Sequence, residues 1–291
     1  MGVGEKFRNF YDSIIMSSDD ISSISYRYRR VTKVLNKYYY SSDSETNHCL
    51  YVGSYGRDTE VYTSDIDMLF ELPYWVYEKY NRYSLNGQSA LLQEVKNVIS
   101  KTYSSSRIKA DGQIISIKFS DGSEIELLPA FLNTDSYSYT YADTNGGGIW
   151  KTTNPKSEQF YINKLNNETN KNLKKICRLF RVWKEVNNVD IPGILIDIFA
   201  YNFLQNYVYK DKSFLYYDFL TRDFLKYLSE QPTSQTKWQT MGSGRFIFHY
   251  SNFQNKAKKS YEDTLKAIDY EDRKFDYSAN LEWRKIYGCR F

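Results

Sequence analysis

Histidine and cysteine are scarce in this 291-residue sequence, which holds two histidines and three cysteines. Cys49, Cys177 and Cys289 lie far apart and are odd in number, so no disulfide framework is indicated. His48 and His249 alone cannot complete the ligand set of a zinc module. The sequence therefore argues against a disulfide scaffold and a zinc module.

Long apolar runs are also absent. No segment approaches the roughly 20 apolar residues that cross a bilayer, and the first residues lack the pattern of a signal peptide. Lys6 stands where an N-myristoylation signal has serine or threonine. We therefore expect a cytoplasmic protein without membrane contact.

The sequence also lacks a strong net charge. The formal net charge is +4 and there is no basic tail, which argues against a dedicated nucleic-acid binder. A hydrophobic content of 41% in 291 residues is sufficient for the cores of one large or two modest domains.

Two short motifs stand close together near residue 60. Gly53 and Ser54 form a small-residue turn of the kind that approaches phosphates, and Asp65 and Asp67 follow in an apolar run. On an extended strand, side chains two positions apart leave the same face with Cβ atoms roughly 7 Å apart. That spacing suits two carboxylates that share metal ions, whereas an ordinary turn and an exposed strand are the alternatives.

A third carboxylate comes from a later strand. Asp121-Gly122 is a hairpin signal, and the strand after it presents Glu124 and Glu126 on one face. Glu126 directly precedes an apolar run, which places it at the edge of buried structure; Glu124 is the alternative third acid, and a solvated strand face would explain both.

Periodicity divides the chain near residue 155. The first part is expected to contain helices at 5–40 with a break and cap at 17–20, turn and strand at 48–72, helices at 75–82 and 88–101, a strand meander at 106–131 and a structured loop at 133–155. The second part is predicted to be helical, at 157–165, 168–187, 192–208, 214–229 and 252–285. No repeat or low-complexity linker separates the two parts.

The sequence resembles the DNA polymerase β-like nucleotidyltransferases, and among them the bacterial cyclic-oligonucleotide synthases (CD-NTases) related to cyclic GMP-AMP synthase and oligoadenylate synthase. Besides the two motifs above, the resemblance rests on four segments, namely 126–131, 141–155, 178–184 and 283–291. It implies an α+β fold of two lobes, with a mixed-sheet nucleotidyltransferase core at 1–155 and a helical lobe at 156–291.

The resemblance also implies a chemistry. Two magnesium ions, with manganese as the alternative, would activate the acceptor hydroxyl and bridge the triphosphate, held by Asp65, Asp67 and Glu126. Glu126 is a departure, since most relatives have aspartate there. Gly53 and Ser54 would contact the triphosphate of ATP, GTP or another nucleoside triphosphate.

Donor phosphates in the family are contacted by a helical lysine, and Arg181 stands at that position. Lys184, one turn further along, is the alternative. Arg57 is left open between a phosphate contact and a solvated side chain.

For contacts with the nucleotide base, the sequence offers several candidate residues. The candidates are Tyr141, Trp150, Asn154 and Tyr201, because a base stacks on aromatic faces and is recognised by amides. For each of them a place in the core is the alternative interpretation.

The implied function is synthesis of a cyclic di- or trinucleotide that acts on a separate effector protein in antiphage defence, with RNA as one candidate activator. Three alternatives stay open: a linear oligonucleotide synthase, a protein or tRNA nucleotidyltransferase, and an inactive nucleotide or RNA sensor. Carboxylates at all three acidic positions disfavour the inactive sensor.

Overall fold

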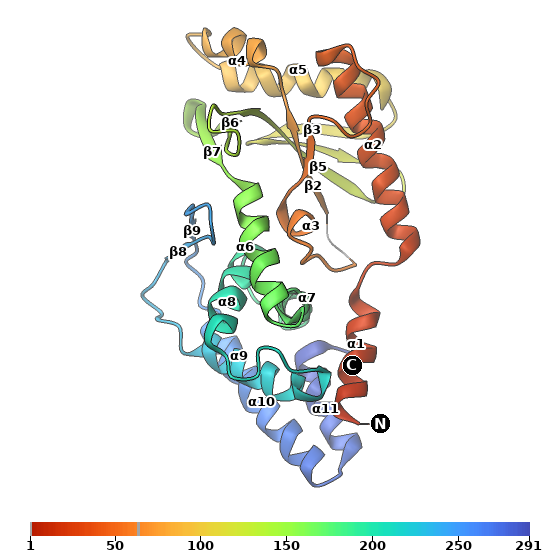
Figure 1. Cartoon of the computed structure of the whole chain (residues 1–291), viewed down its shortest axis with the longest axis vertical. Coiled ribbons are helices and arrows are strands. Elements are labelled where there is room, and N and C mark those ends of the chain that lie inside the picture. Colours follow the sequence, from red (N-terminus) through yellow and green to blue (C-terminus); the bar gives the residue numbers. More distant parts are fainter. Residues whose placement is uncertain (1, 63–64) are drawn as a thin grey trace. The chain divides into compact units, whose positions relative to one another are not determined.

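The computed structural model describes residues 2–62 and 65–291, which pack as two compact units (Figure 1). The first, here the sheet unit, comprises residues 16–57 and 65–157. The second, the helical unit, comprises residues 2–15, 58–62 and 158–291. Within these described residues, no helix has the length and apolar character needed to cross a membrane.

A mixed sheet forms the centre of the sheet unit. In the described chain its main path runs β1-β2-β5-β4-β3, and β6 joins β5 to β7. The strands are β1 (Cys49–Tyr51), β2 (Ile66–Glu71), β3 (Arg107–Asp111), β4 (Ile114–Lys118), β5 (Glu124–Leu132), β6 (Tyr139–Asp143) and β7 (Ile149–Thr153). The β2–β5 pair is parallel, and the other described pairs of this sheet are antiparallel.

Strand alternation gives this sheet two different faces. Ile66, Met68 and Phe70 of β2 are buried in a core with Ile125 and Leu127 of β5. The same core takes the apolar sides of α2 (Ser18–Tyr40), α4 (Tyr74–Asn81) and α5 (Gly87–Thr102). Because side chains alternate, the acidic residues between these apolar ones leave the opposite face.

The helical unit contains α1 (Val3–Ile14), α6 (Pro155–Glu168, whose first turn lies in the sheet unit), α7 (Asn172–Val186), α8 (Gly193–Asn206), α9 (Tyr217–Ser229), α10 (Gln254–Asp272) and α11 (Asp276–Tyr287). The helical unit also contains the 3₁₀-helix η2 (Phe214–Tyr216), which contacts α1. A hairpin is formed by β8 (Lys237–Gln239) and β9 (Phe246–Phe248). Phe7 of α1 packs edge-on against Trp283, with 5.1 Å between ring centroids, and against Phe291 at 5.0 Å.

This aromatic packing explains why the division differs from the expected boundary at residue 155. The first helix was expected to accompany the sheet, but Phe7, Phe10 and Ile14 are buried in the core of the helical unit. The cap of the second helix is confirmed, because the Ser17 side chain accepts a hydrogen bond from the Asp20 amide in a capping box.

Two other expectations are wrong. The segment 133–155 is not a loop: β6 and β7 pair antiparallel within it, so their backbone groups are satisfied by a ladder. The helix expected at 252–285 is two helices, because the chain turns at 273–275, where Lys274 adopts φ +62°. The β8–β9 hairpin was not predicted.

One carboxyl group in the helical unit is buried without full compensation. Glu271 accepts a hydrogen bond from Trp283 Nε1 at 3.0 Å, whereas its second oxygen, Oε2, is buried without a partner among the described residues. Burial raises the pKa of Glu271 to about 7, although Trp283 and Lys6 act in the opposite direction.

The protein should therefore lose stability as the pH rises between about 4.5 and 7. In that window the folded protein keeps a proton on Glu271 that the unfolded chain has released, so raising the pH favours unfolding. Glu271→Gln keeps an acceptor for Trp283 and removes the titration. In urea unfolding, the variant should gain stability relative to the parent as the pH rises through this window; a difference that is constant with pH would contradict the assignment.

Candidate active site

The site begins where β2 meets a short helix, α3 (Gly53–Arg57). The Val52 amide donates to the Asp67 carbonyl at 3.0 Å, and the Ser54 amide donates to the Asp67 side chain. Gly53 has φ +58°, and a Cβ placed on it would lie 1.8 Å from Asp67 Oδ2. Only glycine therefore allows the turn to approach this carboxylate so closely.

The parallel pairing of β2 with β5 brings the third acid to the same place. Asp67 and Glu126 are direct partners in the ladder, and both leave the face opposite the helices. Asp65 is exposed and directly precedes β2. Glu124 lies one pleat before Glu126 and accepts a hydrogen bond from Ser116 Oγ at 2.5 Å.

The electrostatics show a cluster of poorly compensated negative charge. Burial, followed by the charges of Asp67, Asp65 and Glu124, raises the pKa of Glu126 to about 7. The pKa of Asp67 is raised by burial and partly restored by Arg57. That of Asp65 is raised by burial and by Glu124, with Lys118 in opposition. The cluster is thus suited to receive a cation.

The described side chains do not form a complete metal site in this arrangement. Among residues 2–62 and 65–291, no three acidic, histidine or cysteine side chains converge on one metal position. Asp67 is instead hydrogen-bonded to the Ser54 amide and to Glu126. The donor chemistry nevertheless fits magnesium or manganese, which prefer carboxylate oxygens.

Comparison with known proteins decides the family. The family model described as "Second Messenger Oligonucleotide or Dinucleotide Synthetase domain" matches residues 1–166, which is more than half of the chain. The chain belongs to this family. It is accordingly an enzyme of the nucleotidyltransferase type, as the carboxylate cluster and Gly-Ser turn indicate. No functionally curated protein matches the sequence.

Solved structures share the fold over nearly the whole chain. E. coli CdnC, in complex with HORMA-deltaN, is 15% identical with a TM-score of 0.68, covering 99% of this chain and 97% of that one. Vibrio cholerae DncV cyclic AMP-GMP synthase, with a linear intermediate, is 14% identical with a TM-score of 0.72, covering 98% and 96%. The Bradyrhizobium diazoefficiens CD-NTase CdnG, in complex with GTP, is 8% identical with a TM-score of 0.70, covering 99% and 95%. At these identities the likeness is one of fold, and it confirms the expected mixed α+β class.

Arg181 forms its contacts within the helical unit. Its guanidinium is buried and forms a bidentate ion pair with Asp197. The distances are 2.6 Å from Nη1 to Oδ1 and 3.0 Å from Nη2 to Oδ2. This pairing with Asp197 was not predicted from the sequence, and a contact between Arg181 and donor phosphates stays a prediction. Lys184, the alternative, is partly exposed on the same helix.

Two candidate residues have structural partners. Asn154 caps α6, because its Oδ1 accepts the Ser157 amide at 3.0 Å. Trp150 donates from Nε1 to Asn81 at 3.0 Å. Arg57 is buried in the sheet unit and acts electrostatically on Asp67, so it is not a solvated side chain.

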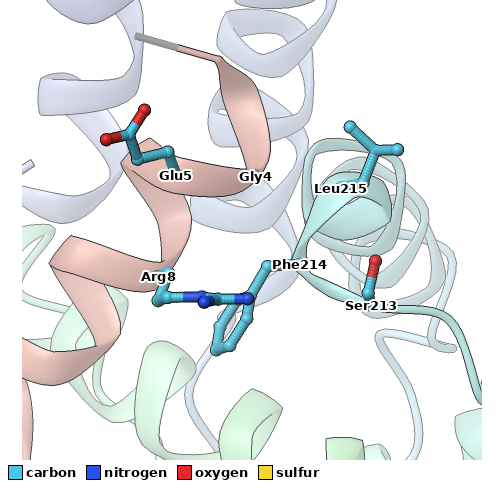
Figure 2. Close-up of a pocket in the computed structure, with 6 residues that line it drawn as sticks. All are labelled: Gly4, Glu5, Arg8, Ser213, Phe214 and Leu215. Carbon is cyan, nitrogen blue, oxygen red and sulfur yellow. The ribbon is translucent and has the colours of Figure 1, made fainter.

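Tyr201 lines a cavity of about 490 Å³ within the helical unit. Aromatic and amide side chains surround it, among them Asn202, Gln235, Trp238 and Gln239. A smaller hollow of about 320 Å³ lies between α1 and η2, where the Arg8 guanidinium is 5.7 Å from the centre of the Phe214 ring (Figure 2). None of its lining residues was predicted as a site residue.

We expect Arg181→Met to destabilise the fold, because it leaves Asp197 buried without its counter-charge. Breaking a buried ion pair at one side costs about 3–5 kcal/mol of unfolding free energy. Replacing Asp197 by methionine as well should recover much of the loss, since the pair is then removed together. Urea unfolding measures both variants, and a fully stable Arg181→Met protein would show that the ion pair is dispensable.

Proposed function

We propose that the enzyme joins nucleoside triphosphates into a cyclic di- or trinucleotide and releases pyrophosphate. The observation that carries the proposal is the direct pairing of Asp67 with Glu126, beside Asp65 and the Gly53-Ser54 turn. Membership in a family of oligonucleotide and dinucleotide synthetases supports the class of product.

In this proposal Asp65, Asp67 and Glu126 hold two divalent cations, Mg²⁺ or Mn²⁺. The ions would supply positive charge for the triphosphate and activation of the attacking hydroxyl. Burial and its acidic neighbours raise the pKa of Glu126, and a bound cation would favour its ionised carboxylate.

Other residues would contact the phosphates and the base of the nucleotide. Gly53 permits close approach of a phosphate to the turn, and Ser54 supplies a hydroxyl and an amide donor. Lys184 takes the role proposed earlier for Arg181 as a cation for the donor phosphates. Tyr201, with its surrounding amides, is suited to a planar base that stacks on a ring and is recognised at its edge.

The product is proposed to act on a separate effector protein in antiphage defence. ATP and GTP are the first substrates to test, and RNA is the first activator. A linear oligonucleotide remains the second candidate product, since the family description includes oligonucleotides without specifying a ring.

A labelled-nucleotide assay tests this proposal. Purified protein with nucleoside triphosphates and Mg²⁺ or Mn²⁺, with and without RNA, should form a product whose label resists phosphatase, because a ring has no terminal phosphate. Asp65→Asn with Asp67→Asn should give a folded protein without product, since the changes are nearly isosteric and remove the metal ligands. Normal turnover in this double variant would refute the site, and a phosphatase-sensitive product would favour linear synthesis.

Glu126 and Glu124 can be separated by matched substitutions. Glu126→Gln should lower turnover by about 100- to 1,000-fold, the range expected for loss of one electrostatic contact to the transition state. Glu124→Gln should have a small effect, because glutamine still accepts the Ser116 hydroxyl. The measurement is kcat for both variants beside Glu126→Asp, which tests whether the shorter family side chain is tolerated. The reverse ranking would move the catalytic role to Glu124.

A further inference from the structure

The segment 58–62 occupies a special place in the chain. It follows Arg57, the last residue of α3, and ends three positions before Asp65, so it directly links the two motifs of the candidate active site. Its own packing, however, is with the helical unit. Three residues span at most about 11 Å of chain, so Tyr62 and Asp65 cannot lie further apart than this.

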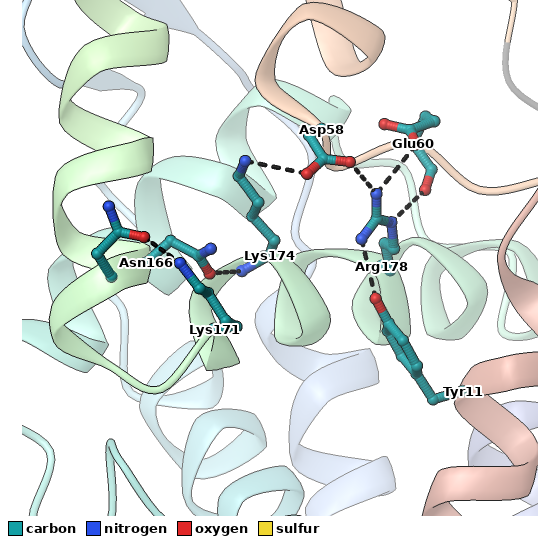
Figure 3. A network of polar contacts seen from close by, with 8 residues as sticks. Tyr11, Asp58, Glu60, Asn166, Lys171, Lys174 and Arg178 are labelled. Carbon is teal, nitrogen blue, oxygen red and sulfur yellow. Dashed lines mark hydrogen bonds and ion pairs between the residues drawn. The ribbon is translucent and has the colours of Figure 1, made fainter.

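Arg178 of α7 contacts this segment through two of its nitrogens and Tyr11 of α1 through the third (Figure 3). Nε donates to the Glu60 carbonyl at 2.9 Å, and Nη2 donates to Glu60 Oε1 at 3.0 Å and to the carboxylate of Asp58. Nη1 donates to the Tyr11 hydroxyl at 2.9 Å. The Arg178 and Glu60 side chains are 11% and 13% exposed, so the charge-assisted bonds between them are largely shielded from water. The Asp58 side chain is 57% exposed.

Other contacts fix the residues around Glu60. Thr59 is fully buried and donates from its hydroxyl to Asp197 Oδ2 at 3.1 Å, the same carboxylate that pairs with Arg181. The Tyr62 amide donates to the Ile14 carbonyl at 3.3 Å, and the Arg290 guanidinium lies 3.7 Å from the centre of the Tyr62 ring. The segment is therefore held by its backbone and by several side chains in succession.

We propose that Arg178 is a positioning residue for nucleotidyl transfer, which acts by fixing segment 58–62 and with it the spacing of the Gly53-Ser54 turn and the Asp65–Asp67 strand. This inference rests on the proposed function, because those two motifs are taken as the catalytic ones. Arg178 itself touches neither motif; its effect passes through Asp58 and Glu60.

The geometry explains why arginine serves here. A guanidinium presents donors in one rigid plane, so one side chain reaches a carbonyl, two carboxylates and a hydroxyl at once. Lysine carries the same charge on a single nitrogen and would keep only part of these contacts. Arg178→Lys should consequently lie between the parent and Arg178→Gln in every measurement.

The first measurement is amide hydrogen exchange of the protein without metal or nucleotide. Arg178→Gln should speed exchange in a peptide that contains 58–62, including the Tyr62 amide, with Arg178→Lys less affected. Arg222→Gln is the matched control, because Arg222 forms an ion pair with Asp223 on α9 and touches no part of the segment. Unchanged exchange at 58–62 in Arg178→Gln would overturn the inference.

The second measurement is steady-state kinetics. Arg178→Gln should lower kcat by about a hundredfold with a smaller change in KM, as misplacement of catalytic groups does. Glu60→Gln should lower kcat to a smaller extent, and the double variant should be no worse than Arg178→Gln alone, because the two residues act through one contact. Additive losses would overturn the inference. Arg222→Gln should keep the parent kcat.

Further variants separate this inference from the proposed function and from misfolding. Asp67→Asn should abolish turnover without changing exchange at 58–62; if it stays active, the proposed function fails, while the exchange result still tests Arg178. Should Arg178→Gln not fold, Tyr11→Phe removes one partner of the guanidinium and leaves its charge. Faster exchange at 58–62 with lower kcat in Tyr11→Phe would support the inference, and parent behaviour in both would overturn it.

Discussion

The candidate site depends on one pairing, the parallel ladder between β2 and β5. Residues on opposite sides of a parallel ladder leave the same face when they are direct partners, and this register makes Asp67 and Glu126 partners. The same alternation buries Ile66 and Met68 beneath the helices, so packing of the apolar face fixes the position of the acidic one. A shift of one residue would exchange the two faces, which makes core packing and site geometry a single constraint.

Much of this arrangement could be predicted from the sequence because the signals are local. The turn at Asp121-Gly122 and the cap at Ser17 each depend on neighbours within a few positions, and the structure contains both. Of the two aspartates expected on one strand, Asp67 lies on β2 and Asp65 directly precedes it. The segment 133–155 was predicted to be a loop because its composition is polar and contains several glycines, whereas the structure shows paired strands there. Strand pairing there depends on partners across the sheet, which composition does not reveal.

Arg181 shows a different limit. The resemblance to nucleotidyltransferases led to the prediction that Arg181 contacts a phosphate. The decisive fact is Asp197, 16 positions away and fully buried, whose charge requires a close cation. No local pattern marks Asp197 as this partner, since it lies within the apolar helix α8. Glu60 and Arg178 are separated by 118 positions and were likewise beyond a local interpretation.

The residues that pack against α1 lie far from it in the sequence, and this distance affects folding during synthesis. The rings that enclose Phe7 belong to Tyr217, Trp283, Tyr287 and Phe291, all of which leave the ribosome long after α1. The core of the sheet unit needs nothing beyond residue 157. During synthesis the sheet can therefore form first, whereas the apolar side of α1 stays without its native partners until the last helix is complete. Over that interval this amphipathic helix is exposed to chaperones and to aggregation.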